Sequence, residues 1–125
     1  MVLTGGMIRP SRMDLCGHVA LENIRRYHFT KAFLGTDAIS PEGILSTTDE
    51  ETSAIAAAVI EQSDEVFILA DSSKIGKTSF VPYGTLGSSK LTLITDKLPG
   101  DTLQSELRSV GVKIMTAAAP EKTKF

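Results

Sequence analysis

A carboxylate, two hydroxyls and a lysine stand together in the segment Asp71-Ser72-Ser73-Lys74. They directly follow residues 65–70, whose unbroken apolar core is typical of a buried strand. Because ligands of open parallel sheets bind beyond the carboxyl ends of the strands, Asp71, Ser73 and Lys74 are candidates to bind the hydroxyls and phosphate of a sugar phosphate. A second interpretation stays open, in which Asp71 only caps the following turn and Lys74 is solvated.

Two further polar clusters are predicted at strand ends. Thr4-Gly5-Gly6 follows Val2-Leu3, which we interpret as a short strand. Gly5 and Gly6 could present backbone N–H groups to an anion, although a Gly-Gly pair is also a common turn. In the second cluster, Asp37 follows a predicted strand and could accept hydrogen bonds from hydroxyls, act as a base, or serve as a local cap.

Other chemistry-bearing residues favour structural roles. His18 and His28 are isolated and lack the spacing of metal ligands. The pair Glu50-Glu51 fits helix capping better than acid–base catalysis. Cys16 is the single cysteine, so an intrachain disulfide is excluded, and we interpret it as a buried, inert thiol. We therefore expect no catalytic residue, no metal and no cofactor.

The first half of the chain predicts two helices around one strand. Residues 14–28 are expected to be helical, with Asp14 as N-cap and with Cys16, Ala20, Ile24 and Tyr27 on one face. Residues 31–35 are predicted to be a strand and residues 36–47 a loop. A capping box formed by Thr48 and Glu51 is expected to open a helix that runs to about Ser63.

The second half continues the alternation. Strands are predicted over residues 65–70, 91–95 and 112–115. A helix capped by Asp101 precedes Gly111, which occupies the usual glycine position after a helix end. Strands that alternate with helices predict an α/β fold with a mostly parallel sheet and helices on both faces. Residues 120–125 are expected to be a frayed tail.

Composition narrows the class of protein. The 125 residues, 42% hydrophobic and 22% charged, suit one globular domain, or most of one. The formal net charge is −2 with no basic stripe, which argues against DNA binding by this segment itself. No apolar stretch approaches the roughly 20 residues of a membrane span, and no signal peptide is visible. Together with the single cysteine, these features predict a cytoplasmic location.

These segments, taken in order, resemble the effector domain of the DeoR family of bacterial transcription regulators. The resemblance extends from about Val2 to Met115 and rests on the following series: Thr4-Gly5-Gly6, Arg9-Pro10, Lys31-Ala32-Phe33-Leu34-Gly35-Thr36-Asp37, Pro41-Glu42-Gly43-Ile44-Leu45, Leu69-Ala70-Asp71-Ser72-Ser73-Lys74 and Leu93-Ile94-Thr95-Asp96.

The resemblance implies a repressor of sugar metabolism whose C-terminal domain resembles ribose-5-phosphate isomerase and glucosamine-6-phosphate deaminase in fold. That domain binds a phosphorylated sugar or related metabolite, which changes the affinity of an N-terminal helix-turn-helix for DNA. The family's effector motif maps onto Asp71 and Lys74, its Gly-x-Asp loop onto Gly35-Thr36-Asp37, and its Gly-Gly turn onto Gly5-Gly6. A homo-oligomer is expected, and no membrane partner.

The chain departs from the family pattern at its start. The helix-turn-helix, the first strand and the Asp-Ser-Gly-Thr-Thr phosphate loop would lie upstream of Val2. The resemblance therefore implies an N-terminally truncated domain over residues 1–119, with a bare sheet edge that invites self-association.

Two other classes of function stay open. One is a sugar-phosphate isomerase or deaminase with Asp37 as general base and Lys74 as phosphate ligand, against which Ala38 stands where the ribose isomerases carry an acid. The other is a purely structural oligomerisation domain. The identity of the effector is left open among phosphorylated hexoses and pentoses, tagatose or fructose derivatives and glycerol phosphate.

Overall fold

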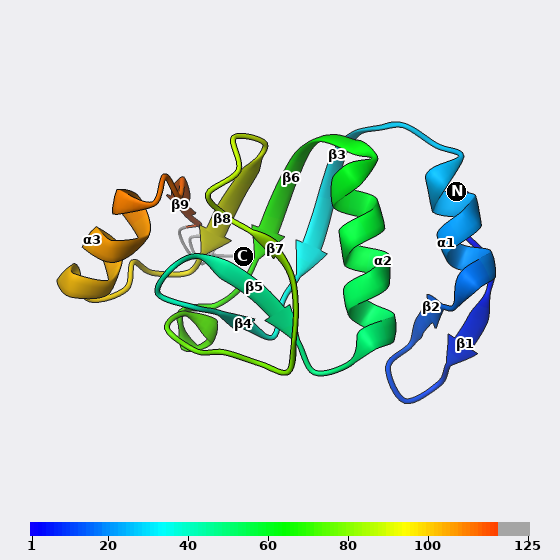
Figure 1. Cartoon of the computed structure of the whole chain (residues 1–125), viewed down its shortest axis with the longest axis horizontal. Coiled ribbons are helices and arrows are strands. Elements are labelled where there is room, and N and C mark those ends of the chain that lie inside the picture. The colour runs from blue at the N-terminus through cyan, green and yellow to red at the C-terminus, as the bar shows by residue number, and fades with distance from the viewer. Residues whose placement is uncertain (118–125) are drawn as a thin grey trace, which may run out of the picture.

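The computed structural model describes residues 1–117 and shows an α/β fold (Figure 1). The expected tail over residues 120–125 lies outside the described residues. In chain order, the elements are β1 (Met7–Arg9), β2 (Asp14–Cys16), α1 (His18–Arg25), β3 (Phe29–Gly35), β4 (Ala38–Ile39), β5 (Ile44–Thr47), α2 (Glu50–Glu61), β6 (Ser63–Leu69), the short 3-10 helix η1 (Ser72–Lys74), β7 (Val81–Thr85), β8 (Leu91–Thr95), α3 (Asp101–Ser109) and β9 (Ile114–Thr116).

The main sheet is parallel and has the strand order β3-β6-β8-β9. This confirms the predicted α/β class and the three strands expected over residues 31–35, 65–70 and 91–95. The core of the domain lies against this sheet and is built on Val66, Ile68, Leu91 and Leu93, all almost fully buried. Branched aliphatic side chains of this kind fit the pleated surface of a sheet.

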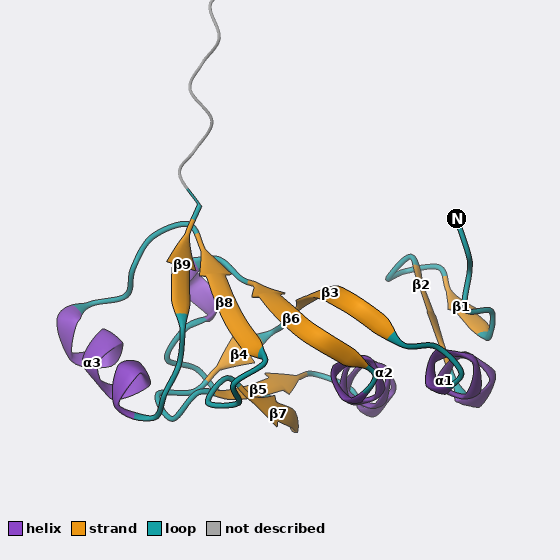
Figure 2. Cartoon of the chain, turned by 90° about the horizontal axis from the view of Figure 1, so that it is seen from above, coloured by secondary structure: helices purple, strands orange, loops and turns teal. Residues whose placement is uncertain are grey.

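Helices α2 and α3 and the second sheet lie on one face of the main sheet, and α1 packs beside α2 (Figure 2). On the opposite face Phe33, Leu69 and Met115 are 61%, 46% and 55% exposed, and Phe33 stacks on Phe67 with ring centroids 5.3 Å apart. The expected helices on both faces are therefore not found within residues 1–117. The apolar run of β6 suggested burial on both sides, but alternate side chains of a strand point to opposite faces, and only Val66 and Ile68 point to the covered one.

A small antiparallel sheet replaces the loop predicted over residues 36–47. It has the strand order β4-β5-β7 and covers the core with Ile39 and Leu45, both fully buried. The loop prediction was wrong because Pro41 and Gly43 break only the connection between β4 and β5, where Gly43 adopts a φ of 83°. The flanking residues form short strands that pair with one another.

The N-terminal elements also differ from the prediction. Val2-Leu3 is not a strand, and β1 and β2 pair as an antiparallel hairpin. The helix begins at His18 rather than at Asp14, because residues 14–16 are held in the hairpin by pairing with β1. Its predicted buried face is confirmed for Ala20 and Ile24, whereas Tyr27 lies beyond the helix and is exposed.

In two helices the observed N-cap lies one residue away from the predicted N-cap. The N-cap of α2 is Asp49, whose carboxylate accepts a hydrogen bond from the Thr52 N–H, so the predicted capping box of Thr48 and Glu51 is not formed. Asp101 is the first residue of α3 rather than its cap. No helix within residues 1–117 is both long enough and apolar enough to cross a membrane.

Candidate functional site

The two polar loops that follow β3 and β6 lie at the same edge of the main sheet. The strands are parallel neighbours, with Gly35 opposite Leu69, so both chains leave the sheet at their carboxyl ends. Beyond this point Ile39 forms a bridge to Ile75 and its carbonyl accepts the N–H of Gly76 at 2.7 Å. The predicted site loops at residues 35–37 and 71–74 are therefore held in one region of the fold.

Asp71 caps the short helix η1. Its carboxylate accepts hydrogen bonds from the hydroxyl of Ser73 and from the Ser73 N–H, the latter at 2.9 Å. The hydroxyl bond and then the backbone bond lower the pKa of Asp71 below its usual range. The next strand contributes Asp96, which accepts the Ser72 N–H at 2.8 Å. Lys74, which is partly buried, is the last residue of η1, and its charge also contributes to the lowered pKa of Asp71.

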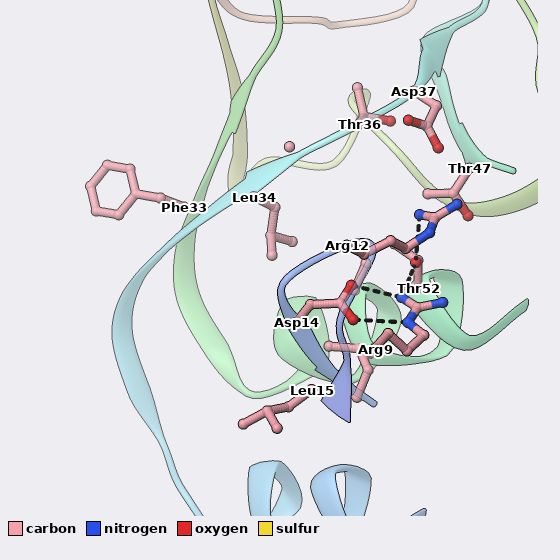
Figure 3. Close-up of a pocket in the computed structure, with 13 residues that line it drawn as sticks. Arg9, Arg12, Asp14, Leu15, Phe33, Leu34, Thr36, Asp37, Thr47 and Thr52 are labelled. Atoms are coloured by element: carbon pink, nitrogen blue, oxygen red, sulfur yellow. Dashed lines mark hydrogen bonds and ion pairs between the residues drawn. The ribbon is translucent and has the colours of Figure 1, made fainter. Parts of the chain in front are cut away.

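A cavity of about 500 Å3 opens beside the first of these loops (Figure 3). The β1–β2 hairpin provides two cations to it, Arg9 and Arg12, and the loop after β3 provides Asp37. Its apolar wall includes Leu34, whose side chain points into the cavity, and Ala56 of α2. We call this cavity the hairpin pocket. It combines an apolar wall with a few convergent polar groups, which is typical of small-molecule sites.

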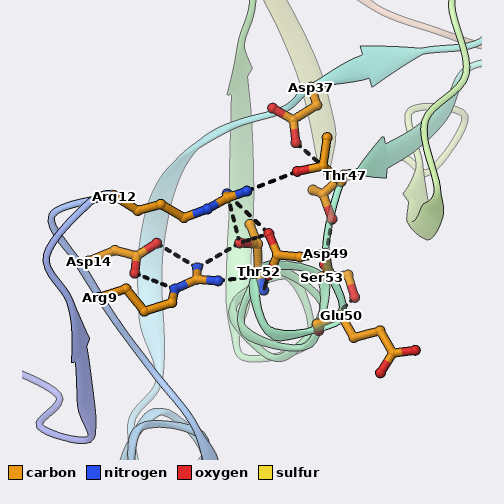
Figure 4. A network of polar contacts seen from close by, with 10 residues as sticks. Arg9, Arg12, Asp14, Asp37, Thr47, Asp49, Glu50, Thr52 and Ser53 are labelled. Atoms are coloured by element: carbon orange, nitrogen blue, oxygen red, sulfur yellow. Dashed lines mark hydrogen bonds and ion pairs between the residues drawn. The ribbon is translucent and has the colours of Figure 1, made fainter.

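Arg9 ties the hairpin to the first turn of α2 (Figure 4). Its guanidinium binds Asp14 through two hydrogen bonds of 2.8 and 2.7 Å, and Asp49 through one of 2.8 Å. A further bond of 2.8 Å reaches the hydroxyl of Thr52. These bonds raise the pKa of Arg9 and lower that of Asp14. Desolvation opposes the ionisation of Asp49, but hydrogen bonds from Thr52 and Arg9 outweigh it, so the pKa of Asp49 is also lowered.

Arg12 and Asp37, which both line the hairpin pocket, contact the same residue, Thr48. Arg12 donates to the Thr48 hydroxyl at 3.0 Å, and the Asp37 carboxylate accepts the Thr48 N–H at 3.0 Å. Arg12 also forms an ion pair with Asp49 at 3.0 Å. A hydrogen-bond donor and an acceptor therefore stand close together in the lining of the cavity.

The structure places the other predicted site residues apart from this pocket. Gly5 and Gly6 pack against α1: the Thr4 carbonyl accepts a 2.6 Å bond from Asn23, and a Cβ on Gly6 would lie 2.5 Å from the Cys16 carbonyl oxygen. Neither glycine lines the hairpin pocket. Their predicted role in binding an anion, like the effector roles of Asp37, Asp71, Ser73 and Lys74, stays a prediction.

Sequence reasoning did not single out Arg9 and Arg12 as site residues. The interactions of Arg9 and Arg12 with Asp49 and Thr52 span about forty positions of the chain, so no local spacing marks them. Within residues 1–117, no group of three or more His, Cys, Asp or Glu side chains is arranged to hold a metal ion.

Residues 1–97 match the protein family described as DeoR C terminal sensor domain. The chain is 35% identical over 119 residues to the HTH-type transcriptional repressor GlcR of Bacillus subtilis, covering 95% of this chain and 45% of that protein. It is 32% identical over 117 residues to the HTH-type transcriptional regulator GlpR of Haloferax volcanii, covering 94% and 46%. It is 31% identical over 103 residues to the lactose phosphotransferase system repressor of Streptococcus mutans, covering 82% and 40%.

The chain thus spans less than half the length of these curated relatives. No solved structure shows a significant similarity to it.

Proposed function

The chain belongs to the DeoR C-terminal sensor domain family, and from that premise we propose that it binds a phosphorylated sugar or related metabolite as an effector. The proposed binding region is the sheet edge that carries the loops after β3 and β6, together with the hairpin pocket. Asp71, Ser73 and Lys74 would form one side of the site and Asp37 the other. The ligand would be bound and released unchanged.

The single observation that carries the proposal is the juxtaposition of these two polar loops. A phosphorylated sugar needs a cation for its phosphate and acceptors for its hydroxyls. Lys74 supplies a cation, and the hydrogen bonds that lower the pKa of Asp71 keep that carboxylate ionised as an acceptor at neutral pH. Because the carboxyl ends of neighbouring parallel strands meet at one edge, the loop after β3 could add the carboxylate of Asp37 to these two groups.

We further propose that the output is a change in DNA binding by a longer protein. GlcR and GlpR are both named HTH-type, and this chain spans less than half of each. A helix-turn-helix in the remaining part of such a protein would contact DNA, and effector binding would shift it between states of different DNA affinity. A homo-oligomer, which the open edge of β3 would favour, also belongs to this proposal.

An isomerase or deaminase remains the alternative, with Asp37 as the general base. The Asp37 carboxylate already accepts the Thr48 N–H, and the next residue, Ala38, is buried and carries no acid. The relatives described above are named as regulators. A sensor leaves its ligand unchanged, whereas this enzyme would convert it, so product analysis after incubation separates the two functions.

The first experiment is a thermal-shift screen of the chain against hexose, pentose, tagatose and fructose phosphates and glycerol phosphate. A ligand that binds only the folded state at about 100 times its Kd adds roughly 2.7 kcal/mol of stability. For a domain of this size we expect the melting temperature to rise by roughly 10 °C.

Variants identify the site. Lys74→Ala should remove most of this shift and Asp71→Asn should reduce it. Lys31→Ala, a change at an exposed lysine on the uncovered face of β3, is the matched control and should leave it unchanged. A chain that responds to no phosphorylated metabolite would contradict the proposed function, and a hit that is insensitive to Lys74→Ala would contradict the proposed site.

A further inference from the structure

We propose that the hairpin pocket binds the uncharged, hydroxyl-bearing part of the effector through Arg12 and Asp37, and that the phosphate lies outside this pocket, toward Lys74. This inference rests on the proposed function and assigns a different part of the ligand to each half of the site. Arg12 then acts as a specificity residue for the sugar rather than as the phosphate ligand that an arginine in a pocket first suggests.

The charges in and around the hairpin pocket disfavour a phosphate. Arg9, Arg12, Asp14 and Asp37 line it, and Asp49 is ion-paired to both arginines. Two cations therefore face three carboxylates, and both cations are already ion-paired, whereas Lys74 forms no ion pair within residues 1–117. A phosphate dianion placed there would be repelled by carboxylates in a region partly screened from water, where such interactions are stronger.

Arg9 has at most one N–H group left for an anion, because four of its five N–H groups already donate to other side chains. Its Nε, Nη1 and Nη2 atoms already donate to Asp14, Asp49 and Thr52 at 2.7–2.8 Å. Its side chain is 21% exposed, and turning it toward a ligand would break the link between the hairpin and α2. Arg9 therefore holds the pocket in shape, and we assign it a positioning role.

Arg12 is the cation that can reach a ligand. Its side chain is 42% exposed, and its bonds to Thr48 and Asp49 use Nη2 and Nη1. Within the described part of the chain, Nε of Arg12 donates to no other residue, so it can donate to a hydroxyl oxygen. One hydrogen bond from a charged group to a neutral hydroxyl does not require the neighbouring carboxylates to be displaced.

Asp37 supplies the matching acceptor. Only one of its carboxylate oxygens accepts the Thr48 N–H, and Thr48 also binds Arg12. Neighbouring hydroxyls of a sugar can therefore donate to Asp37 and accept from Arg12 on either side of a single residue. Leu34 and Ala56 give the pocket an apolar wall, against which the C–H face of a sugar ring can pack.

The test compares three probes by isothermal titration: the strongest phosphorylated sugar of the screen, the same sugar without its phosphate, and inorganic phosphate. Arg12→Ala and Asp37→Asn should each weaken the binding of the phosphorylated sugar by about tenfold, the loss expected for one hydrogen bond to a charged group. Both variants should leave the affinity for inorganic phosphate within about twofold. Lys74→Ala should weaken inorganic phosphate and the phosphorylated sugar alike.

Two controls keep the result specific. Arg25→Ala removes an exposed arginine from the last turn of α1 and should change none of the three affinities. Arg12→Lys should recover part of the sugar affinity, because a lysine can donate one hydrogen bond from a similar position. Thermal melts of each variant verify folding before titration.

The outcomes separate this inference from the proposed function. If Arg12→Ala weakens inorganic phosphate as strongly as the phosphorylated sugar, the hairpin pocket is the phosphate site and the inference is wrong. The wild-type chain could also bind the phosphorylated sugar with an affinity that only Lys74→Ala weakens. The hairpin pocket is then unused and the inference is again wrong, while the proposed function stands. If no probe binds the wild-type chain, the proposed function itself fails.

Discussion

Two glycine substitutions test whether the Gly5-Gly6 turn is needed for the fold or for binding an anion. Gly5 and Gly6 both adopt left-handed backbone conformations, with φ values of 69° and 102°. They differ in what an added methyl group would meet. At Gly5 the nearest atom is Nδ2 of Asn23 at 3.7 Å, whereas at Gly6 a Cβ would lie 2.5 Å from the Cys16 carbonyl oxygen and 3.0 Å from the Ala20 Cβ.

The expected loss of stability has two causes, the left-handed φ and the atoms that the added methyl group would meet. A left-handed φ costs an L-residue about 1 kcal/mol, and Gly5→Ala incurs only this cost. Gly6→Ala adds a collision with the backbone carbonyl of Cys16, which is 1% exposed and cannot move without disturbing the start of α1. Overpacking of this kind costs about 2 kcal/mol, so we expect a total of about 3 kcal/mol for Gly6→Ala.

Thermal unfolding followed by circular dichroism measures the difference. For a domain of this size, the melting temperature should fall by about 4 °C for Gly5→Ala and by about 12 °C for Gly6→Ala. Hydrogen exchange at the β1–β2 hairpin shows whether the loss is local. Equal losses for the two variants would refute the close approach at Gly6. A Gly5→Ala chain that stays folded but loses affinity for inorganic phosphate would support the anion-binding prediction for this turn.

Two other predictions concern the covered face of the main sheet and the ion pairs of Arg9 with Asp14 and Asp49. In urea denaturation, Ile68→Ala should lower the free energy of unfolding by about 3 kcal/mol, because Ile68 is fully buried. Leu69→Ala, at the neighbouring but 46% exposed position, should lower it by well under half of that amount. Similar losses for the two variants would mean that both faces of β6 are buried. Because the folded-state pKa values of Asp14 and Asp49 are lowered, the stability that they contribute is complete above the unfolded value of about 4 and is lost as the pH falls further. Urea denaturation in steps below about pH 4 should show this loss, and Arg9→Met should flatten the pH dependence; an unchanged dependence would contradict the role of Arg9.

Local pattern in the sequence was sufficient for the main sheet and for its polar edge. The apolar runs of β3, β6 and β8 identify parallel strands, and the polar residues directly after them must then meet at one edge. For this reason it could be predicted that the loops at residues 35–37 and 71–74 lie at one edge of the sheet. The buried face of α1 followed in the same way from helical spacing.

The other elements and the ion pairs of the hairpin depend on contacts between residues that are far apart in the sequence. The helix predicted from Asp14 begins at His18, because pairing with β1 holds residues 14–16 in a hairpin. Residues 36–47 form strands, because β4 and β5 pair with each other and β5 also pairs with β7 about forty positions later. Arg9 meets Asp49 only because the fold places the hairpin beside α2.

The division has a physical reason. Hydrophobic periodicity reports which side of a strand or helix faces the core, and that information is local, so the sequence alone determined the parallel strands and the polar ends that they share. Hairpin pairing and ion pairs depend on the distance between segments that are far apart in the chain, which the pattern of either segment does not contain. Only the tertiary structure could therefore bring Arg9, Arg12 and Asp37 together around one pocket.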